Sequence, residues 1–368
     1  MKKEIKHYNI DKLVSYNADI NILFGERSSG KSWQLKHKRG LLNYLETGKR
    51  FILMRRFREE ITNEKIEKYF DDVDVEGITN GKYNCITTYR KGIFLSNFSS
   101  DTFKVTRGEK IGYAVALSTE QNYAGGSFLD VSDIIFEEFM TRSRYLGANS
   151  RYLGDNEPGK LMNFYATIDR KRGTTKLWLV GNTISRVCPY IYEWGLHEII
   201  SKQKQGTIET KEINATDDDI VKLAIEYCES TGTSSHTIGW NKDMMNTGSW
   251  QTSPQPHLPK SKNLYNVCYR IAFMYQSFKF IGELLQDKET KEVCWFIYPY
   301  DKDIDNKTVV FTDVISPSIY YQRNIYDITI KNENLQKLLN TFREDKIFYA
   351  SDLVGTDFKQ VIDFSIRR

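Results

Sequence analysis

Residues 25–32 read Gly25-Glu26-Arg27-Ser28-Ser29-Gly30-Lys31-Ser32 and fit the Walker A pattern G-x-x-x-x-G-K-[ST] at every fixed position. An apolar run at Ile20–Phe24 precedes this stretch and predicts a buried strand, while a helical pattern begins at Lys31. The glycines let backbone N–H groups point into a phosphate-sized nest, and the helix N-terminus favours the same anion. We therefore expect all eight residues to bind a nucleotide, with Lys31 on the β- and γ-phosphates and the Ser32 hydroxyl on Mg²⁺.

Two adjacent acids end a later strand. The apolar run Val131–Phe136 leads directly into Glu137 and Glu138. Beside a phosphate loop, Glu137 would hold the Mg²⁺-bound water network and Glu138 would polarise the attacking water as general base. Asp is more usual than Glu at the metal-side position, which leaves open whether Glu137 contacts the metal directly or through water. Two solvated surface acids are the alternative interpretation.

The order of the predicted strands indicates the class of ATPase. A further strand at Phe51–Met54 lies between the phosphate loop and the acidic strand, and a fourth follows at Lys176–Val180. Because strands alternate with helices here, we predict an α/β fold with a mostly parallel, doubly wound sheet. The extra strand and the second acid indicate a P-loop NTPase of the additional-strand catalytic-glutamate (ASCE) type. The sequence contains no Asn-Lys-x-Asp guanine motif, so ATP is preferred over GTP.

Two further polar residues lie at the ends of predicted elements. Asn182 follows the fourth strand, where a polar side chain can read the γ-phosphate; an ordinary turn Asn is the alternative. Arg170 ends a helix expected to start near Pro158, with Arg172 two residues later. The position of Arg170 allows two roles, favourable charge at a helix C-terminus or an arginine finger for a neighbouring subunit's nucleotide.

Composition excludes several other classes of protein. The chain has 368 residues, 40% of them hydrophobic, with a mean hydropathy of −0.52 and no apolar run near the ~20 residues that span a bilayer. Its five Cys and five His have no metal-ligand spacing, so we expect a soluble protein with free thiols and no zinc module. Residues 1–200 contain 31 Lys+Arg and 25 Asp+Glu, and this basic excess permits a phosphate-rich partner.

The character of the sequence changes after residue 200. We expect an amphipathic helix over Asp217–Glu229 and a Ser-, Gly- and Pro-rich linker over residues 230–262. An antiparallel meander and two helices should follow, at Phe278–Leu285, Val293–Tyr298 and Thr308–Val314 and then at Asn332–Arg343 and Thr356–Ile362. The expected domains are an ATPase domain at 1–200, a helical linker and loop at 201–262, and an α+β domain at 263–368.

Several motifs together resemble a known family. They span about residues 8–195 and comprise residues 25–32, Met54-Arg55-Arg56-Phe57, residues 131–139, Gly181-Asn182-Thr183 and Cys188-Pro189-Tyr190. This set is similar to that of the phi29-like phage DNA-packaging (encapsidation) ATPases, which are terminase-type motors. The resemblance implies a homomeric, pentameric ring that pumps double-stranded DNA into a procapsid in the host cytoplasm, transiently at the portal vertex.

The resemblance also implies partners and roles for individual residues. The partners are double-stranded DNA, other copies of the chain, the phage portal (connector) and, as a further candidate, a structural RNA; no membrane is implied. Arg170 matches the family's trans-acting arginine, and Arg172 and Arg151 are the substitutes to test. The C-terminal domain is expected to be RNase H-like and a vestigial nuclease. A working nuclease would need several carboxylates that converge on two metal ions. The spacing of the available acids does not single out such a set, so we expect a binding module for DNA, RNA or portal. These acids are Glu283, Asp287, Asp301, Asp303 and Asp313.

A packaging motor should hold DNA through its phosphates, without sequence preference. The candidate contacts are Lys104, Arg107 and Lys110, in a basic region that we expect to be a loop. A helicase or another nucleic-acid remodelling ATPase is an alternative function, and a non-motor nucleotide-binding regulatory protein is another. Strand displacement and DNA-stimulated ATP hydrolysis would distinguish the three.

Overall fold

The computed structural model describes residues 8–123, 125–126, 128–141, 152–153, 156–216, 219–231, 247–275, 278–305, 307–312, 321–322, 340–342, 344 and 346–366. The chain divides into two compact units. The first comprises Met1–Arg142, Ser150–Ile184 and Ile199–Ser249, and the second comprises Ser143–Asn149, Ser185–Glu198 and Trp250–Arg368. Within the described ranges, no helix has both the length and the apolar character needed to span a membrane.

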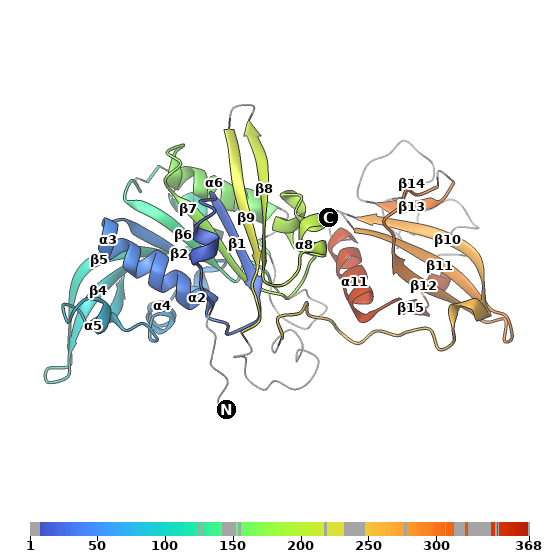
Figure 1. Cartoon of the computed structure of the whole chain (residues 1–368), viewed down its shortest axis with the longest axis horizontal. Helices are drawn as coiled ribbons and strands as arrows, with labels where there is room; N and C mark the ends of the chain where they lie inside the picture. The colour runs from blue at the N-terminus through green and yellow to red at the C-terminus, as the bar shows by residue number, and fades with distance from the viewer. Residues whose placement is uncertain are drawn as a thin grey trace. The chain divides into compact units, whose positions relative to one another are not determined.

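A nine-stranded sheet forms the centre of the first unit, in the order β3-β4-β5-β2-β6-β7-β1-β9-β8 (Figure 1). The strands are β1 (Ile20–Gly25), β2 (Arg50–Arg55), β3 (Cys85–Tyr89), β4 (Gly92–Ser99), β5 (Lys104–Ala116), β6 (Val131–Glu137), β7 (Lys176–Asn182), β8 (Thr207–Thr216) and β9 (Asp219–Tyr227). Every neighbouring pair from β5 to β9 in this order is parallel, and the outer pairs are antiparallel. The predicted mostly parallel α/β sheet is confirmed.

Strand order brings the predicted site residues to one edge of this sheet. β7 pairs with β1 on one side and with β6 on the other, so the phosphate-loop strand and the acidic strand are separated by the strand that ends at Asn182. β2 pairs with β6 as the additional strand. Since parallel strands end at the same edge, the residues that follow β1, β6 and β7 come together there.

The helix after the phosphate loop has three consecutive segments, α2 (Lys31–Gln34), the π-helical η1 (Leu35–Leu42) and α3 (Asn43–Thr47). Gly48 ends it with φ of 69°, a left-handed conformation that glycine adopts without strain. The helix covers one face of the sheet through apolar packing of Leu35 and Leu41 against Leu23, Leu53 and Val180. This packing holds the start of the helix at the edge where the phosphate loop lies.

Shorter elements complete the first unit: α1 (Asp11–Val14), η2 (Arg58–Glu60), α4 (Asn63–Tyr69), α5 (Val75–Ile78), η3 (Leu117–Tyr123) and α6 (Glu157–Asp169). η2 and α4 are separate helices, because the Thr62 hydroxyl accepts from the Lys65 N–H and caps the start of α4. α6 confirms the helix expected near Pro158, and Asn156 caps its start.

The amphipathic helix predicted over Asp217–Glu229 is wrong, because this stretch contains the strand β9. β9 pairs in parallel with β1, with Ile225 beside Ile22, and in antiparallel with β8. The Val221, Leu223 and Ile225 side chains follow a period of two, and pairing with the otherwise open edge of β1 selects that period. As a result, the first unit extends beyond the expected boundary at residue 200.

The second unit contains a six-stranded sheet in the order β14-β13-β10-β11-β12-β15 (Figure 1). Its elements are α7 (Pro189–Glu193), β10 (Tyr265–Tyr275), β11 (Phe278–Asp287), β12 (Val293–Pro299), β13 (Val309–Thr312), β14 (Tyr321–Gln322), β15 (Ile347–Tyr349) and α11 (Asp352–Ile366); α8 (His197–Lys202) begins in this unit and ends in the first. The antiparallel pairing expected between Phe278–Leu285 and Val293–Tyr298 is confirmed by β11 and β12, and α11 contains the helix predicted at Thr356–Ile362. The third strand of the expected meander is wrong in its pairing, because β13 pairs in parallel with β10, a strand that was not predicted. The helix predicted at Asn332–Arg343 lies almost entirely outside the described residues. The aromatic core includes Phe273, Trp295 and Phe358.

Acids of the second unit are paired with cations of the same unit. Glu283 is 1% exposed and forms ion pairs with Lys262 and Arg270, while Asp287 pairs with Lys260. Asp313 lies outside the described residues. Within the part of the chain that the structure describes, no three His, Cys, Asp or Glu side chains are grouped to hold a metal ion.

Candidate nucleotide-binding site

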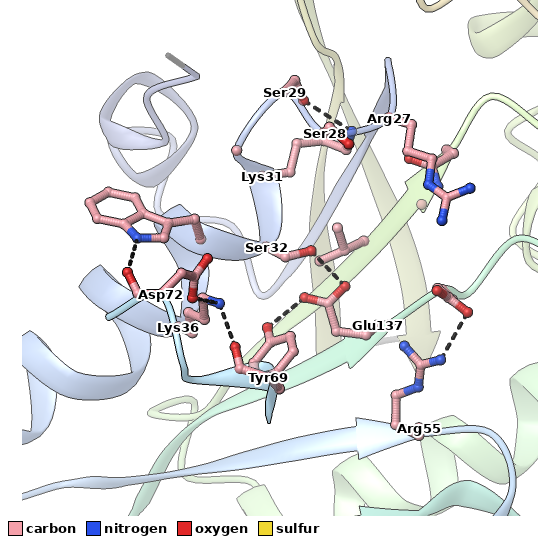
Figure 2. A pocket seen from close by; sticks show the side chains of 16 residues that line it. Arg27, Ser28, Ser29, Lys31, Ser32, Lys36, Arg55, Tyr69, Asp72 and Glu137 are labelled. Carbon is pink, nitrogen blue, oxygen red and sulfur yellow. Dashed lines mark hydrogen bonds and ion pairs between the residues drawn. The ribbon is translucent and has the colours of Figure 1, made fainter. Parts of the chain in front are cut away.

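A cavity of about 500 Å³ opens at the edge of the first sheet where β1, β6 and β7 end (Figure 2). Its walls come from the phosphate loop, the helix that follows, the end of α4 with Asp72 just beyond it, and the ends of β2, β6 and β7. The lining residues are Arg27–Ser32, Trp33, Lys36, Arg55, Tyr69, Asp72, Glu137, Glu138 and Val180–Asn182. The sequence-predicted loop, acid pair and strand-end Asn therefore share one cavity of a size that holds a small ligand.

The phosphate loop depends on two glycines for different reasons. Gly30 has φ of 97° and precedes the first residue of α2, in a conformation that L side chains rarely adopt. A Cβ on Gly25 would lie 3.2 Å from the Cys228 carbonyl oxygen, so Cys228, the residue after β9, would have to shift to admit a side chain there. The Glu26 side chain is buried and accepts from the Ser230 hydroxyl and the Thr231 N–H, so it anchors the loop rather than lining the cavity.

Lys31 is folded back onto the loop. Its ammonium donates to the Glu26 carbonyl and, at 3.2 Å, to the Ser29 hydroxyl, with 4% of the residue exposed. Burial lowers the pKa of Lys31, and this outweighs the opposing effect of nearby groups that include Glu137. A bound phosphate would supply the countercharge that this buried cation needs.

Glu137 forms a hydrogen bond with Ser32, the other residue of the predicted metal site. Its Oε2 accepts from the Ser32 hydroxyl at 2.9 Å and its Oε1 accepts from the Tyr69 hydroxyl at 2.7 Å; Figure 2 shows both hydroxyls pointing at this carboxylate. Burial raises the pKa of Glu137, and the two hydroxyl donors only partly oppose that effect. A hydroxyl and a carboxylate are the hard oxygen donors that Mg²⁺ prefers, so these residues fit that ion.

Glu138 lies directly after β6, but an arginine holds its carboxylate. Its backbone adopts φ of 58°, and its Oε2 accepts from Arg55 at 2.8 Å; the same arginine pairs with Glu60 at 3.0 Å. The neighbouring Arg56 is buried and donates to the Glu138 and Phe139 carbonyls at 3.1 and 2.7 Å. Arg55 thus holds the side chain of Glu138, and Arg56 holds the backbone turn that carries it.

A buried ion pair between Arg56 and Glu157 stabilises that turn. The Arg56 guanidinium contacts both carboxylate oxygens of Glu157 at 2.9 and 3.0 Å, and Glu157 is the first residue of α6. In the sequence, Arg55 and Arg56 stand out only as part of the motif Met54-Arg55-Arg56-Phe57. The signal that could have found their roles is two adjacent arginines directly after a buried strand, in the sheet position next to the acidic strand.

Asn182 is the last residue of β7 and lines the cavity, as its position in the sequence predicts. Thr183 follows it, is fully buried, and donates its hydroxyl to the Ser249 carbonyl at 2.9 Å. The chain segment at Ser249 is therefore attached to the residue next to Asn182.

Arg170 does not line the cavity of its own chain. It follows α6 with φ of 51°, is exposed, and donates to the Gly126 carbonyl at 2.5 Å. Arg172 instead donates to carbonyls of its own chain, including those of Ile168 at 2.7 Å and Leu129 at 2.9 Å. Arg151 lies outside the described residues. Among the described residues, Arg172 thus forms more hydrogen bonds within its own chain than Arg170 does.

The basic region expected as a loop before the acidic strand is part of a strand instead. Lys104 and Arg107 lie in β5, where the pairing of Ser99 with Lys104 extends the β4–β5 hairpin to its tip. Both side chains are exposed. Lys110 is half-buried, and its ammonium lies 3.8 Å from the Tyr113 ring centroid. Burial lowers the pKa of Lys110, so this lysine is a poorer phosphate contact than the other two.

Sequence reasoning missed four cavity residues: Trp33, Lys36, Tyr69 and Asp72. Lys36 forms an ion pair with Asp72, and the Trp33 indole N–H donates to the Asp72 carbonyl at 3.3 Å. These contacts join the helix after the phosphate loop to the end of α4. No motif in the sequence marks them, because the two elements meet only in the fold.

Comparison with known proteins identifies similar chains. The family model for the podovirus DNA encapsidation protein (Gp16) matches residues 1–217, more than half of the chain. The DNA packaging protein of Bacillus phage phi29 is 28% identical over 201 residues, which cover 53% of this chain and 52% of the relative. That of Bacillus phage B103 is 29% identical over 197 residues, or 52% of each chain. The matched region thus spans about half the length of these relatives.

A solved structure extends the likeness in fold to both units. The bacteriophage phi29 viral genome packaging motor assembly contains a chain that is 21% identical, covers 98% of this chain and 99% of its own length, and aligns with a TM-score of 0.57. At that level of identity the likeness establishes the fold.

Proposed function

Because the chain belongs to the podovirus DNA encapsidation protein (Gp16) family, we propose that it hydrolyses ATP with Mg²⁺ to move double-stranded viral DNA into a procapsid. The observation that carries the proposal is the single cavity in which a complete phosphate loop, the Ser32–Glu137 pair, Glu138 and Asn182 meet. This combination supplies anion binding, oxygen donors for a divalent cation, a general base and a polar residue near the γ-phosphate.

Each residue has a defined task in the proposed reaction. Backbone N–H groups of residues 25–32 bind the phosphates, and Lys31 turns from its loop contacts toward the β- and γ-phosphates. Ser32 and Glu137 would hold Mg²⁺, which supplies charge neutralisation at the phosphates when bound. Glu138 must leave Arg55 before it can accept a proton from the attacking water, so release of that ion pair is part of the activation step. Asn182 hydrogen-bonds the γ-phosphate.

The proposed assembly is a homo-oligomeric ring, pentameric as in the resembling family, that acts in the host cytoplasm at the portal of a procapsid. Arg170 supports this proposal because it is exposed, lies outside its own cavity and keeps donors available for a neighbouring copy. A portal protein and a structural RNA are the further partners that we propose. The second unit would serve as a binding module, since its buried acids are occupied by cations.

The tip of the β4–β5 hairpin is the proposed DNA contact. Lys104 and Arg107 are exposed there, and neither has a carboxylate within ion-pair distance among the residues that the structure describes. Arg107 instead stacks over the Tyr89 ring at 4.4 Å. A two-stranded ribbon with cations can follow a duplex groove, and contacts to phosphates do not read sequence.

The decisive experiment measures the ATPase rate against protein concentration, with and without double-stranded DNA. The proposal predicts a rate per subunit that rises with concentration, as rings form, and rises further with DNA. A rate that DNA does not change would favour a non-motor nucleotide-binding protein. Displacement of one strand of a short duplex would favour a helicase.

A further inference from the structure

A tyrosine outside every nucleotide-binding motif contacts the metal-side acid. The Tyr69 hydroxyl donates to Oε1 of Glu137 at 2.7 Å, while Ser32 donates to Oε2 of the same carboxylate at 2.9 Å. Figure 2 shows Tyr69 approaching from the α4 side of the cavity and Ser32 from the helix after the phosphate loop. Both oxygens of this buried acid are therefore held, and one of the two donors has no assigned role.

Tyr69 is itself fixed by the helix that follows the phosphate loop. The Lys36 ammonium donates to the Tyr69 carbonyl and lies 4.7 Å from the centroid of its ring. Lys36 also pairs with Asp72, whose carbonyl accepts from Trp33. Ser32, Trp33 and Lys36 lie within two turns of one helix, so the element that presents Ser32 also positions Tyr69.

The identity of the acid gives this contact a purpose. Glu137 has one more rotatable bond than the Asp that is usual at this position, so its carboxylate has more orientations to choose from. A hydrogen bond to one carboxylate oxygen removes that freedom and orients the other oxygen. Outer hydrogen-bond partners commonly orient metal ligands in this way.

We propose that Tyr69 is a positioning residue of the metal site: its hydroxyl fixes Oε1 of Glu137 and thereby directs Oε2 toward the Mg²⁺ position beside Ser32. The inference rests on the proposed Mg²⁺-dependent nucleotide binding. It predicts that Tyr69 affects the linkage between metal and nucleotide, and leaves nucleotide binding without metal unchanged.

The test is calorimetric binding of ADP to the full chain, with Mg²⁺ titrated in one series and removed by EDTA in the other. Tyr69→Phe deletes only the hydroxyl, and we expect the apparent Mg²⁺ affinity to fall about 10- to 100-fold while ADP affinity in EDTA stays at the wild-type value. Tyr44→Phe is the matched control. The Tyr44 hydroxyl donates to Glu109 at 3.1 Å, away from the cavity, and its loss should leave the Mg²⁺ dependence unchanged.

A double-mutant comparison tests whether Tyr69 acts by positioning the carboxylate of Glu137 or only by supporting the fold of the cavity. In Glu137→Asp the shorter carboxylate cannot reach both hydroxyls, so adding Tyr69→Phe should weaken Mg²⁺ binding by no more than about twofold further. Full additivity, or equal loss of ADP affinity with and without Mg²⁺, would overturn the proposal, as would wild-type Mg²⁺ dependence in Tyr69→Phe. If the wild-type chain itself binds ADP without any Mg²⁺ dependence, the proposed function fails and this inference fails with it.

Discussion

Two buried carboxylates, Glu137 in the first unit and Glu283 in the second, are stabilised in different ways. Glu137 at the end of β6 is held by two neutral hydroxyls, from Ser32 and Tyr69. Glu283 in β11 is held by two cations, Lys262 and Arg270. Burial raises the pKa of Glu137, whereas at Glu283 the two cations outweigh the effect of burial and leave its pKa below the ordinary value.

The contrast distinguishes Glu137, which the proposed function assigns to metal binding, from Glu283, which stabilises the fold. Hydroxyl donors orient Glu137 without forming an ion pair with it, so the proposed Mg²⁺ would still gain from binding there. The charge of Glu283 is already compensated inside the protein, so a metal would have to displace two basic side chains. The partners of a buried acid therefore distinguish the two roles better than burial alone does.

The largest expected effect is the loss of ATP hydrolysis when Arg170, a cation with no acidic partner in the described part of its chain, is substituted. Unlike Arg270, Arg170 has no carboxylate within ion-pair distance in the described part of its chain. Arg170→Ala should bind ATP but lose hydrolysis by ~10³–10⁵-fold, because a finger supplied in trans acts only in the transition state. Mixing it with Lys31→Ala subunits, which keep Arg170, should restore part of the ATPase rate.

A structural Arg170 predicts a different pattern of results. Loss of its hydrogen bond to Gly126 would lower the melting temperature, and mixing would restore nothing. Co-assembled, folded but inactive mixtures would move the search to Arg151, because Arg172 already donates to several carbonyls of its own chain.

The next effect tests the acid beside Glu137. Glu138→Gln removes the proposed general base but keeps a side chain of the same shape, so ATP should bind with unchanged affinity while turnover falls ~10²–10⁴-fold. ATP affinity by calorimetry and turnover by phosphate release measure the two separately. Near-normal turnover would show that Glu138, held by Arg55, does not act as the base.

Substitution of the structural acid should affect stability instead of catalysis. Glu283→Gln leaves Lys262 and Arg270 without their counterion and should lower the free energy of unfolding by ~1–3 kcal/mol, measured by denaturant titration. ADP affinity should stay at the wild-type value. A loss of ADP binding without a loss of stability would contradict the assignment of Glu283 to structure.

The pH dependence of this effect has a defined sign. The pKa of Glu283 is lower in the folded chain, so its contribution to stability is present above the ordinary glutamate pKa of about 4.3 and is lost as the pH falls below that value. The difference in stability between the wild type and Glu283→Gln should therefore shrink on acidification. A difference that stays constant with pH would indicate lost packing rather than lost charge.

The smallest effects concern the hairpin tip. Lys104→Ala and Arg107→Ala should each weaken duplex DNA binding equally for all sequences and reduce the slope of log K against log salt by about 1. Lys110→Ala is the matched control, because Lys110 is half-buried over Tyr113 and should change the slope less. Binding measured at several salt concentrations on unrelated duplexes gives these slopes. An equal effect of all three substitutions on the slope would contradict the proposal that Lys104 and Arg107 contact DNA more closely than Lys110 does.

Local patterns in the sequence predicted most of the cavity correctly. The phosphate loop, Glu137, Glu138 and Asn182 all lie at or directly after the ends of apolar strands, and parallel strands bring such ends to one edge. The contact of Tyr69 with Glu137 could not be predicted, because it depends on how α4 packs against the phosphate-loop helix. Ile220, Leu223, Ala224 and Tyr227 have a helical spacing, whereas Val221, Leu223 and Ile225 in the same stretch have the spacing of a strand. Only pairing with the edge of β1 decides between the two.

The hydrogen bond from Thr183 to the Ser249 carbonyl has a mechanical consequence. Two of the places where the chain passes from the first unit to the second, after Ile184 and after Ser249, lie within two residues of this bond. A pulling force on the chain after Ile184 would reach Thr183 along the backbone, and a force on the chain after Ser249 would reach Thr183 through the hydrogen bond. Asn182 is the adjacent residue, and it faces the cavity. Tension on either of these two segments would therefore act on the strand end that carries Asn182.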